Sequence, residues 1–262
     1  MTCQFPRCVL ILVLLVSSAV TAAAQSRPTF EGMWSDPPPT AEDLFCIAWC
    51  TDAGLERLGK LLDDPANDSR PYVQLALEAS AYQTQQYIRP RLTAAALNAF
   101  PLDDATDPGF LRCMPWGLAR QNAARHQLEI RRAGGDRLEM RYGEWDARRT
   151  VYMDGRPRPV NAAPTKMGHS VGRYDGDALV IETSGIAADR TPFRSEHSDQ
   201  LRVVERYTRP ADGNRLLLTV TMEDPWSLRE PVVLKKVWRW APTAEIAPYT
   251  DCKLPTEFSL GK

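Results

Sequence analysis

The sequence predicts an α+β protein in which an eight-stranded antiparallel β-barrel is covered by an N-terminal helical segment. Seven β-forming runs separated by Gly- and Asp-containing turns fill residues 127–240, and an eighth run lies at 30–34. Helical periodicity is confined to residues 40–100. Short strands at this spacing favour an antiparallel barrel or sandwich, and eight strands close a barrel that is wide enough for one small ligand. We treat residues 25–262 as a single domain.

The first 24 residues have the pattern of a secretory signal peptide. Arg7 precedes an apolar run at 9–16, and three alanines at 22–24 supply a small-residue cleavage site. The apolar run is shorter than the roughly 20 residues that a membrane-spanning helix needs. We therefore expect cleavage after Ala24, export to the periplasm or the medium, and no membrane insertion of the mature chain from Gln25 onward.

The balance of charge limits the partners. The chain carries 32 basic and 33 acidic residues without a long run of either sign, so it lacks the electrostatic footprint of a nucleic-acid-binding protein. Its histidines, His126, His169 and His197, show none of the spacings of metal-binding motifs. We expect a small-molecule ligand or substrate, with no metal and no cofactor, and leave the oligomeric state open.

The cysteines that remain after signal cleavage suit an oxidising compartment. Loss of Cys3 and Cys8 leaves an even number, Cys46, Cys50, Cys113 and Cys252, which allows three disulfide pairings. Cys46 and Cys50 lack the C-x-x-C spacing of a redox or zinc motif. Structural disulfides are therefore the expected use of these residues.

The first strand, within residues 25–39, contains Gly32 and Trp34 and is ended by the prolines at 37–39. This Gly-x-Trp is similar to the first strand of lipocalin-type barrels, in which the Trp plugs the barrel base. That resemblance implies a lipocalin-like barrel. The alternative is an edge strand with a buried Trp.

Residues 40–100 form the predicted helical cap. Four helices are expected: one begun by the approximate capping box of Thr40 and Asp43, one after Thr51, one through Pro71 toward Ile88, and one at 92–100. None is apolar all round, which favours packing against another element.

The remainder is predicted as an ordered loop, a β-meander and a tail. Residues 101–126 are rich in Pro, Gly and Asp and lack periodicity, so they are assigned to the loop. The meander spans 127–252, and the tail spans 253–262. Strands of the meander are expected at 127–132, 137–142, 148–153, 178–184, 201–209, 215–223 and 232–240.

Four segments between about residues 107 and 252 carry a family resemblance: RCMPWG at 112–117, YMDGRPRP at 152–159, GHSVGRYDGDALVIET at 168–183 and HSDQLRVVERYTR at 197–209. They resemble a family of exported, largely uncharacterised bacterial proteins with RCxPxG, YMDGRPxP, GHSxGRxxGDxLVxxT and HSxxLRVVERY segments and a Cys near the C-terminal end. The resemblance implies a shared domain and a Cys113–Cys252 disulfide, but no reaction. This chain departs from the family at Ala119, Arg158, Tyr174, Asp175 and Ala178, of which Arg158 replaces a possible functional His.

The leading functional hypothesis is cofactor-free acid/base catalysis. His169 and Arg173 lie on a predicted Gly-framed loop, where scaffolds commonly carry binding and catalytic groups. Strand alternation places Glu205 on an apolar face and Arg206 on the opposite one, and it likewise places Glu182 on the same face as Val180. A carboxylate on a core-facing surface has a raised pKa unless it is paired, as a general acid or base requires.

The predicted protein is thus an exported small-molecule-binding barrel that acts as an isomerase, lyase or hydrolase. His169 and Glu205 would transfer protons and Arg173 would stabilise negative charge, with substrate contacts from Trp34, Trp116, Tyr174 and His197. One alternative is a lipocalin-like carrier without turnover, with a cavity lined only by aliphatic and aromatic groups. A purely structural interpretation of the charged residues is that Glu205 and Glu182 each meet an Arg across the sheet on the solvated side, while a buried His169 only ties its loop together. The minor alternative is a serine hydrolase, because Gly168 to Gly172 spells G-x-S-x-G around Ser170.

Overall fold

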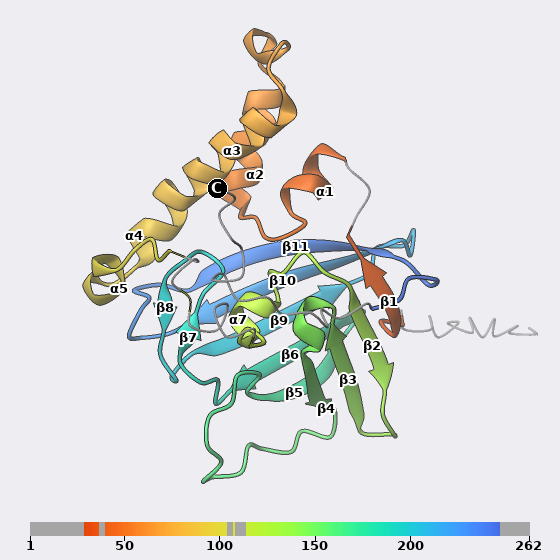
Figure 1. Cartoon of the computed structure of the whole chain (residues 1–262). Helices are drawn as coiled ribbons and strands as arrows, with labels where there is room; N and C mark the ends of the chain where they lie inside the picture. The colour runs from red at the N-terminus through yellow and green to blue at the C-terminus, as the bar shows by residue number, and fades with distance from the viewer. Residues whose placement is uncertain (1–28, 37–39, 104–106, 108–113, 247–262) are drawn as a thin grey trace, which may run out of the picture.

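The computed structural model describes residues 29–36, 40–103, 107 and 114–246, and its described strands form a closed barrel (Figure 1). The nine barrel strands are hydrogen-bonded in the order β1-β11-β10-β9-β6-β5-β4-β3-β2. Their bounds are β1 (Gly32–Ser35), β2 (Leu128–Arg132), β3 (Arg137–Tyr142), β4 (Arg148–Tyr152), β5 (His169–Asp175), β6 (Ala178–Ser184), β9 (Arg202–Thr208), β10 (Arg215–Glu223) and β11 (Val232–Trp240). The α+β barrel is therefore confirmed at the level of fold class.

Two details of the predicted barrel were wrong, and both concern β5. The stretch that begins at His169, predicted as a loop, is a strand, so the barrel has nine strands rather than eight. β5 also pairs with β4 in parallel, with Val151 opposite Ser170, whereas the other barrel pairs are antiparallel. A parallel pair needs a long crossover, and the segment 153–168 supplies it.

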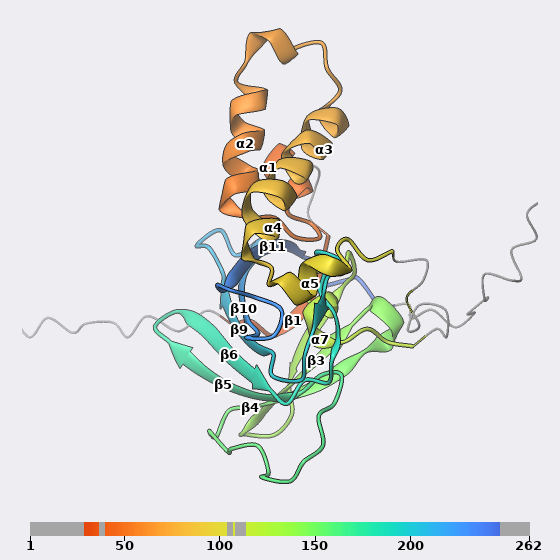
Figure 2. The ribbon, with the colours of Figure 1, turned by 90° about the vertical axis from the view of Figure 1, so that its left-hand side faces the viewer.

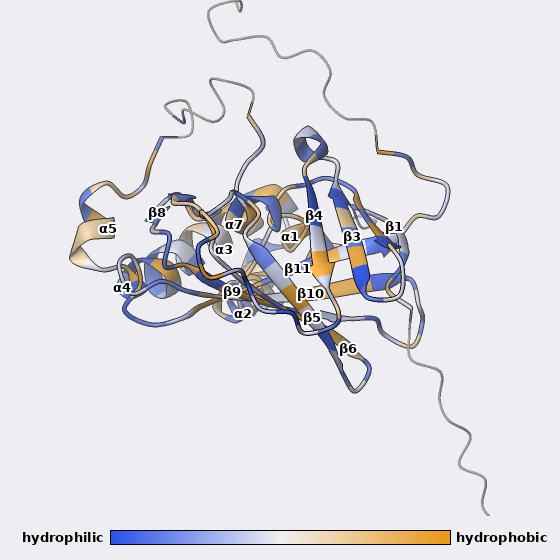
Figure 3. Ribbon diagram, turned by 90° about the horizontal axis from the view of Figure 1, so that it is seen from below, coloured by the Kyte–Doolittle hydropathy of each residue, from blue (hydrophilic) through white to orange (hydrophobic). Residues whose placement is uncertain are grey.

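Side-chain alternation gives the barrel its core. Along β10, Leu216, Leu218, Val220 and Met222 are buried and their neighbours are partly exposed. Figure 3 shows the same alternation of hydrophilic and hydrophobic residues along β3. Successive residues of a strand point to opposite faces, so these strands direct a mainly apolar face inward and a more polar face outward.

An aromatic cluster closes the seam between the first and last strands. Trp34 is fully buried, its Nε1 donates to the Phe30 carbonyl at 2.9 Å, and its ring meets Trp240 edge-on at 4.9 Å. The Arg209 guanidinium lies 5.2 Å and 5.0 Å from these two rings. Gly32 has φ +129°, and a Cβ there would collide with the Trp240 ring. The Gly-x-Trp pattern thus allows β1 to pack closely against β11.

The helical segment packs beside the barrel and extends away from it (Figure 2). It contains α1 (Ala41–Phe45), α2 (Asp52–Leu62), η1 (Pro65–Asn67), α3 (Tyr72–Gln83), the π-helical η2 (Thr84–Ile88), α4 (Arg89–Arg91) and α5 (Ala94–Asn98). As predicted, Thr51 begins α2, because its hydroxyl accepts from the Gly54 N–H at 3.0 Å. The α2–α3 pair forms its own apolar cluster, which touches the barrel at the outward-facing Val237 of β11.

A disulfide fixes the base of this helical arm. Cys46 and Cys50 are bonded to each other, and Cys50 forms a β-bridge with Lys235 of β11. Next along that strand, Lys236 is buried in the barrel and its ammonium donates to the carbonyls of Ile47 and Ala124. Burial lowers the pKa of Lys236 to about 7.

Shorter elements complete the described chain. The predicted loop 101–126 contains α7 (Leu118–Gln121), all four residues of which are buried. The other elements are η4 (Glu144–Asp146) and the two-stranded sheet of β7 (Asp189–Arg190) and β8 (Glu196–His197). Among the described residues, no helix is long and apolar enough to cross a membrane. The predicted signal peptide, Cys113, Cys252 and the tail 253–262 lie outside the described residues.

Candidate functional site

A groove of about 480 Å³ lies on the outer face of β5 and β6, beside the crossover segment 153–168. It brings together His169 and Arg173, two of the three predicted catalytic residues. Further charge comes from Asp154, Arg158, Glu182 and Arg202, and apolar wall comes from Met153, Pro157 and Val171. The groove therefore combines cationic and apolar surface.

His169 is held in a defined orientation at one side of the groove. Its ring stacks on Tyr152 at 5.0 Å with an interplanar angle of 23°, and its Nε2 lies 3.1 Å from the Arg156 carbonyl oxygen. A carbonyl only accepts hydrogen bonds, so this contact assigns a proton to Nε2. In the neutral ring Nδ1 is then the atom with the lone pair, which makes it the proton acceptor.

Three charged side chains form a ladder across the outer face. Arg173 of β5 and Arg202 of β9 each donate to Glu182 of β6, at 2.7 Å. Hydrogen bonds from Arg202 and Arg173 lower the pKa of Glu182, so its carboxylate stays ionised near neutral pH. Glu182 was predicted to face the core with Val180. The register instead aligns Ile181 with Glu205 on the inner face, which turns Glu182 outward.

The crossover segment is fixed by its own contacts. The Arg156 guanidinium donates to Asp154 and lowers the pKa of that carboxyl to about 2. The Arg158 Nη2 donates to the Ala162 carbonyl, and a Cβ at Gly185 would collide with the Arg158 side chain. Farther on, Thr165 forms a parallel bridge with Ile186. Contacts within the chain thus hold the wall of the groove in place.

Comparison with known protein families, curated proteins and solved structures finds no match.

Glu205 lies in the barrel interior, away from the groove. Its two carboxylate oxygens accept from Arg149 at 2.6 Å and 2.7 Å, and Tyr207 donates to it at 2.7 Å. Burial acts to lower the pKa of Arg149, but the charge and hydrogen bonds of Glu205 together with the nearby Tyr142 and Tyr207 outweigh it, so the pKa is raised. His169 and Glu205 project from opposite faces of the sheet, so the structure does not bring the predicted proton-transfer pair together.

Ser170 also points into the barrel. Its hydroxyl lies 2.9 Å from the Thr183 hydroxyl and accepts from Arg149 at 3.4 Å. It lies inside β5, and β6 follows after a turn at Gly176. A nucleophile elbow requires a strand, a sharp turn at the Ser and then a helix. The G-x-S-x-G stretch of this chain lacks that arrangement.

The predicted substrate-binding residues do not line the groove. Trp34 is part of the aromatic seam, and Tyr174 stacks on Phe30 at 6.4 Å. Trp116 lies beside α7 under the Arg120 guanidinium, at 4.1 Å. His197 is buried in β8, its Nδ1 contacts the Ser198 carbonyl at 2.9 Å, and burial lowers its pKa.

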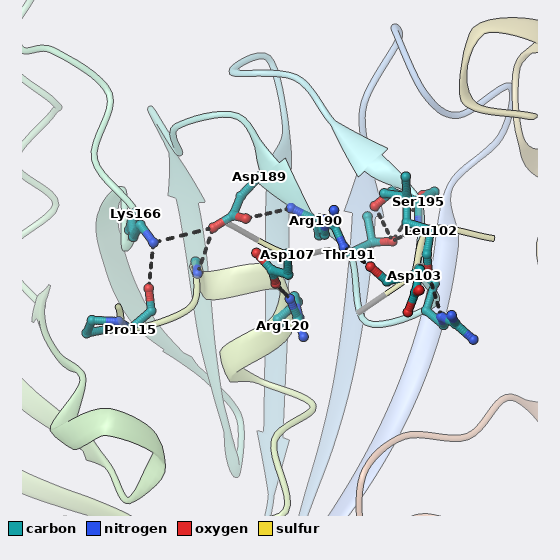
Figure 4. A network of polar contacts seen from close by, with 12 residues as sticks. Leu102, Asp103, Asp107, Pro115, Arg120, Lys166, Asp189, Arg190, Thr191 and Ser195 are labelled. Atoms are coloured by element: carbon teal, nitrogen blue, oxygen red, sulfur yellow. Dashed lines mark hydrogen bonds and ion pairs between the residues drawn. The ribbon is translucent and has the colours of Figure 1, made fainter. Parts of the chain in front are cut away.

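The region around α7 is a polar network that joins distant parts of the chain (Figure 4). Asp189 accepts from the Gly117 N–H at 3.1 Å, and Lys166 donates to the Pro115 carbonyl at 2.6 Å. The Arg190 side chain donates to the Asp103 carbonyl at 2.7 Å. Each contact ties a backbone group of the 103–117 region to a side chain from 166–190, which indicates a structural role.

Sequence reasoning missed residues both in the groove and in the barrel interior. Arg158 had been noted only as a departure from the family pattern, and Arg202 was not considered. Arg149, the partner of Glu205, is 56 positions away in the chain, so no local pattern indicated it. Among the described residues, no group of three or more His, Cys, Asp and Glu side chains is arranged to hold a metal ion.

Proposed function

We propose that this protein is an exported binding protein for a small, partly apolar anion, which it holds in the groove beside β5 and β6. The observation that supports this proposal is the composition of the groove, in which Arg158, Arg173 and Arg202 adjoin apolar wall. Guanidinium groups form charge-assisted hydrogen bonds with carboxylates, phosphates and sulfonates. The anion would bind the arginines while its apolar part covers Met153 and Val171.

Export is supported by two features. The first 24 residues have the composition of a cleavable signal, and the Cys46–Cys50 disulfide suits an oxidising compartment. The intact mass of the protein recovered from the exported fraction tests this part, because a mature chain beginning at Gln25 is expected. An uncleaved chain there would contradict it.

The test of binding uses anilinonaphthalene sulfonate, a fluorescent aromatic anion. We expect saturable binding that falls about tenfold in Arg202→Gln, because one charge-assisted contact is lost. The matched control is Arg206→Gln. Arg206 lies on the same face of β9, is 47% exposed against 48% for Arg202, and pairs with Asp175 outside the groove. Equal affinities for the two variants would contradict the proposal.

A second candidate function is single-base catalysis in the same groove. It is favoured by the His169 tautomer, which leaves Nδ1 to accept a proton while Arg173 stabilises developing negative charge. This enzyme would be an isomerase, lyase or hydrolase that uses one general base rather than a His169–Glu205 pair. Incubation of the exported protein with the molecule that copurifies with it, followed by mass spectrometry, distinguishes turnover from carriage.

His169→Gln is the matched variant for that test. Gln can still donate to the Arg156 carbonyl but cannot act as a base near neutral pH. An enzyme would lose about 10²- to 10⁴-fold in turnover and keep its melting temperature. A carrier would show no chemical change of the ligand in either protein.

A further inference from the structure

A second hollow lies on the outer face of β3 and β4, and it contains a cluster of arginines that packing of the fold does not require. Its volume is about 250 Å³, and its lining residues include Arg131, Arg141, Arg148 and Thr150. One carboxylate, Glu139, also lines it and accepts from Arg131 at 2.9 Å, so the unbalanced positive charge of the hollow lies at Arg141 and Arg148. It shares no lining residue with the groove beside β5 and β6. The two sites can therefore be tested separately.

Two arginines face each other directly at this hollow. In the β3–β4 register Arg141 is opposite Arg148, and like charges in this position repel. Asp146 bridges them: its Oδ2 accepts from the Arg148 Nη2 at 3.0 Å, and its Oδ1 accepts from the Arg141 Nε. Burial acts to raise the pKa of Asp146, but hydrogen bonds from Arg141 and Arg148 outweigh it and lower the pKa.

The turn that presents Asp146 is itself unfavourable. Trp145 and Asp146 have φ values of 54° and 52°, so two consecutive residues other than Gly adopt the left-handed region. Such backbone outliers persist only where the surroundings enforce them, and they are concentrated at functional sites. Here the outlier places a carboxylate as the counter-ion of a like-charged pair.

The arginines keep donors for a ligand. Within the described chain, Asp146 takes one nitrogen of Arg141 and one of Arg148, and neither guanidinium has another carboxylate partner. Each guanidinium carries five N–H groups in a planar fork that matches a tetrahedral oxyanion. The side chain of Arg149, by contrast, is committed to Glu205 inside the barrel.

We propose that this hollow binds a phosphate group, either free inorganic phosphate or the phosphate of a small monoester. Arg141 and Arg148 hold the anion from adjacent strands, and the Thr150 hydroxyl borders it, together with Arg131, whose charge is balanced by Glu139. Asp146 is the resident counter-ion, which stabilises the arginine pair when the site is empty and competes with the ligand. A dianion suits two facing cations better than a single carboxylate does.

Isothermal titration with inorganic phosphate and with phenyl phosphate, in chloride buffer at constant ionic strength, tests the proposal. We expect saturable binding of one anion per chain, and tighter binding of phenyl phosphate would identify an ester as the preferred form. Arg141→Gln and Arg148→Gln should each weaken binding tenfold or more. Arg137→Gln is the matched control, because Arg137 lies on the same face of β3 but outside the hollow, and it should stay within twofold of wild type.

Asp146→Asn is a variant in which the affinity for phosphate should rise. Asn tolerates the left-handed backbone and removes the competing charge, so phosphate should bind three- to tenfold more tightly. Thermal melts without ligand identify any variant that has lost its fold. The phosphate affinities of the variants that remain folded then test whether the hollow binds phosphate. No saturable binding by wild type, an equal loss in the Arg137→Gln control, or weaker binding in Asp146→Asn would each overturn the proposal.

Discussion

Two sets of arginine–carboxylate contacts lie on opposite faces of the same sheet. Inside the barrel, the Arg149 and Glu205 side chains are 1% and 0% exposed and are joined by two hydrogen bonds. Outside, Arg173, Glu182 and Arg202 are 59%, 37% and 48% exposed. The chemistry is the same, but the inner pair exchanges its water for protein partners, whereas the outer three keep contact with solvent. Burial therefore commits the inner pair to the fold and leaves the outer set able to bind a ligand.

The largest effect is expected when the inner pair is broken. Glu205→Gln leaves the Arg149 charge buried without its counter-ion, which typically costs about 3 to 5 kcal/mol of unfolding free energy. For a domain of this size that lowers the melting temperature by roughly 6 to 20 °C. Differential scanning calorimetry measures it. If the melting temperature of the variant stayed within roughly two or three degrees of wild type, the buried pair would contribute no more to stability than the exposed one.

The buried Lys236 should determine how the unfolding free energy varies above neutral pH. Lys236 releases its proton near pH 7 in the folded protein but near pH 10.5 when unfolded. Between these values the unfolded state binds more protons, so stability rises with pH, by about 1.4 kcal/mol per pH unit. Urea unfolding at pH 7 and at pH 9 should show a gain on the order of 2 kcal/mol.

Lys236→Met is the control for that pH dependence. It removes the titrating group and should flatten the rise, although it also leaves the Ile47 and Ala124 carbonyls without their donor. An identical slope in wild type and variant would assign the pH dependence to other groups.

The smallest change in stability is expected on the outer face. Glu182→Gln removes one charge from a solvent-exposed ladder, where ion pairs contribute about 0 to 1 kcal/mol. The unfolding free energy should change by less than about 1 kcal/mol, while the groove becomes more cationic and binds anilinonaphthalene sulfonate a few-fold more tightly. Paired unfolding and fluorescence titrations measure both. A loss of stability as large as that of Glu205→Gln would remove the contrast between the faces.

Local patterns in the sequence were sufficient for most of the barrel. Turn residues and alternation located eight strands, and Thr51 located the start of α2, because these signals act over a few residues. The ninth strand was missed because Gly172 within it, Gly168 just before it and its polar residues resemble a loop. It forms because β6 pairs with it along seven residues, from His169 opposite Ser184 to Asp175 opposite Ala178.

The candidate site was less accessible to sequence reasoning. Alternation correctly separated Glu205 from Arg206, since each strand fixes its own two faces. Alternation alone does not show which face of one strand continues the inner face of the next. Glu182 was therefore assigned to the wrong side of the sheet, and His169 was grouped with Glu205. Register between strands depends on long-range pairing, and a shift of one residue exchanges inside for outside.

The pairing of Trp34 with Trp240 has a consequence for biosynthesis. The strand that begins the barrel can meet its last partner only after more than two hundred further residues have been added. A chain that emerges from a ribosome or a translocation pore, N-terminus first, therefore cannot close the barrel until β11 has emerged. Until then the edge of β1 that faces β11 is open, and closure of the barrel is delayed. A truncation that removes β11 should accordingly leave a chain that chaperones and proteases recognise, even though every earlier strand is present.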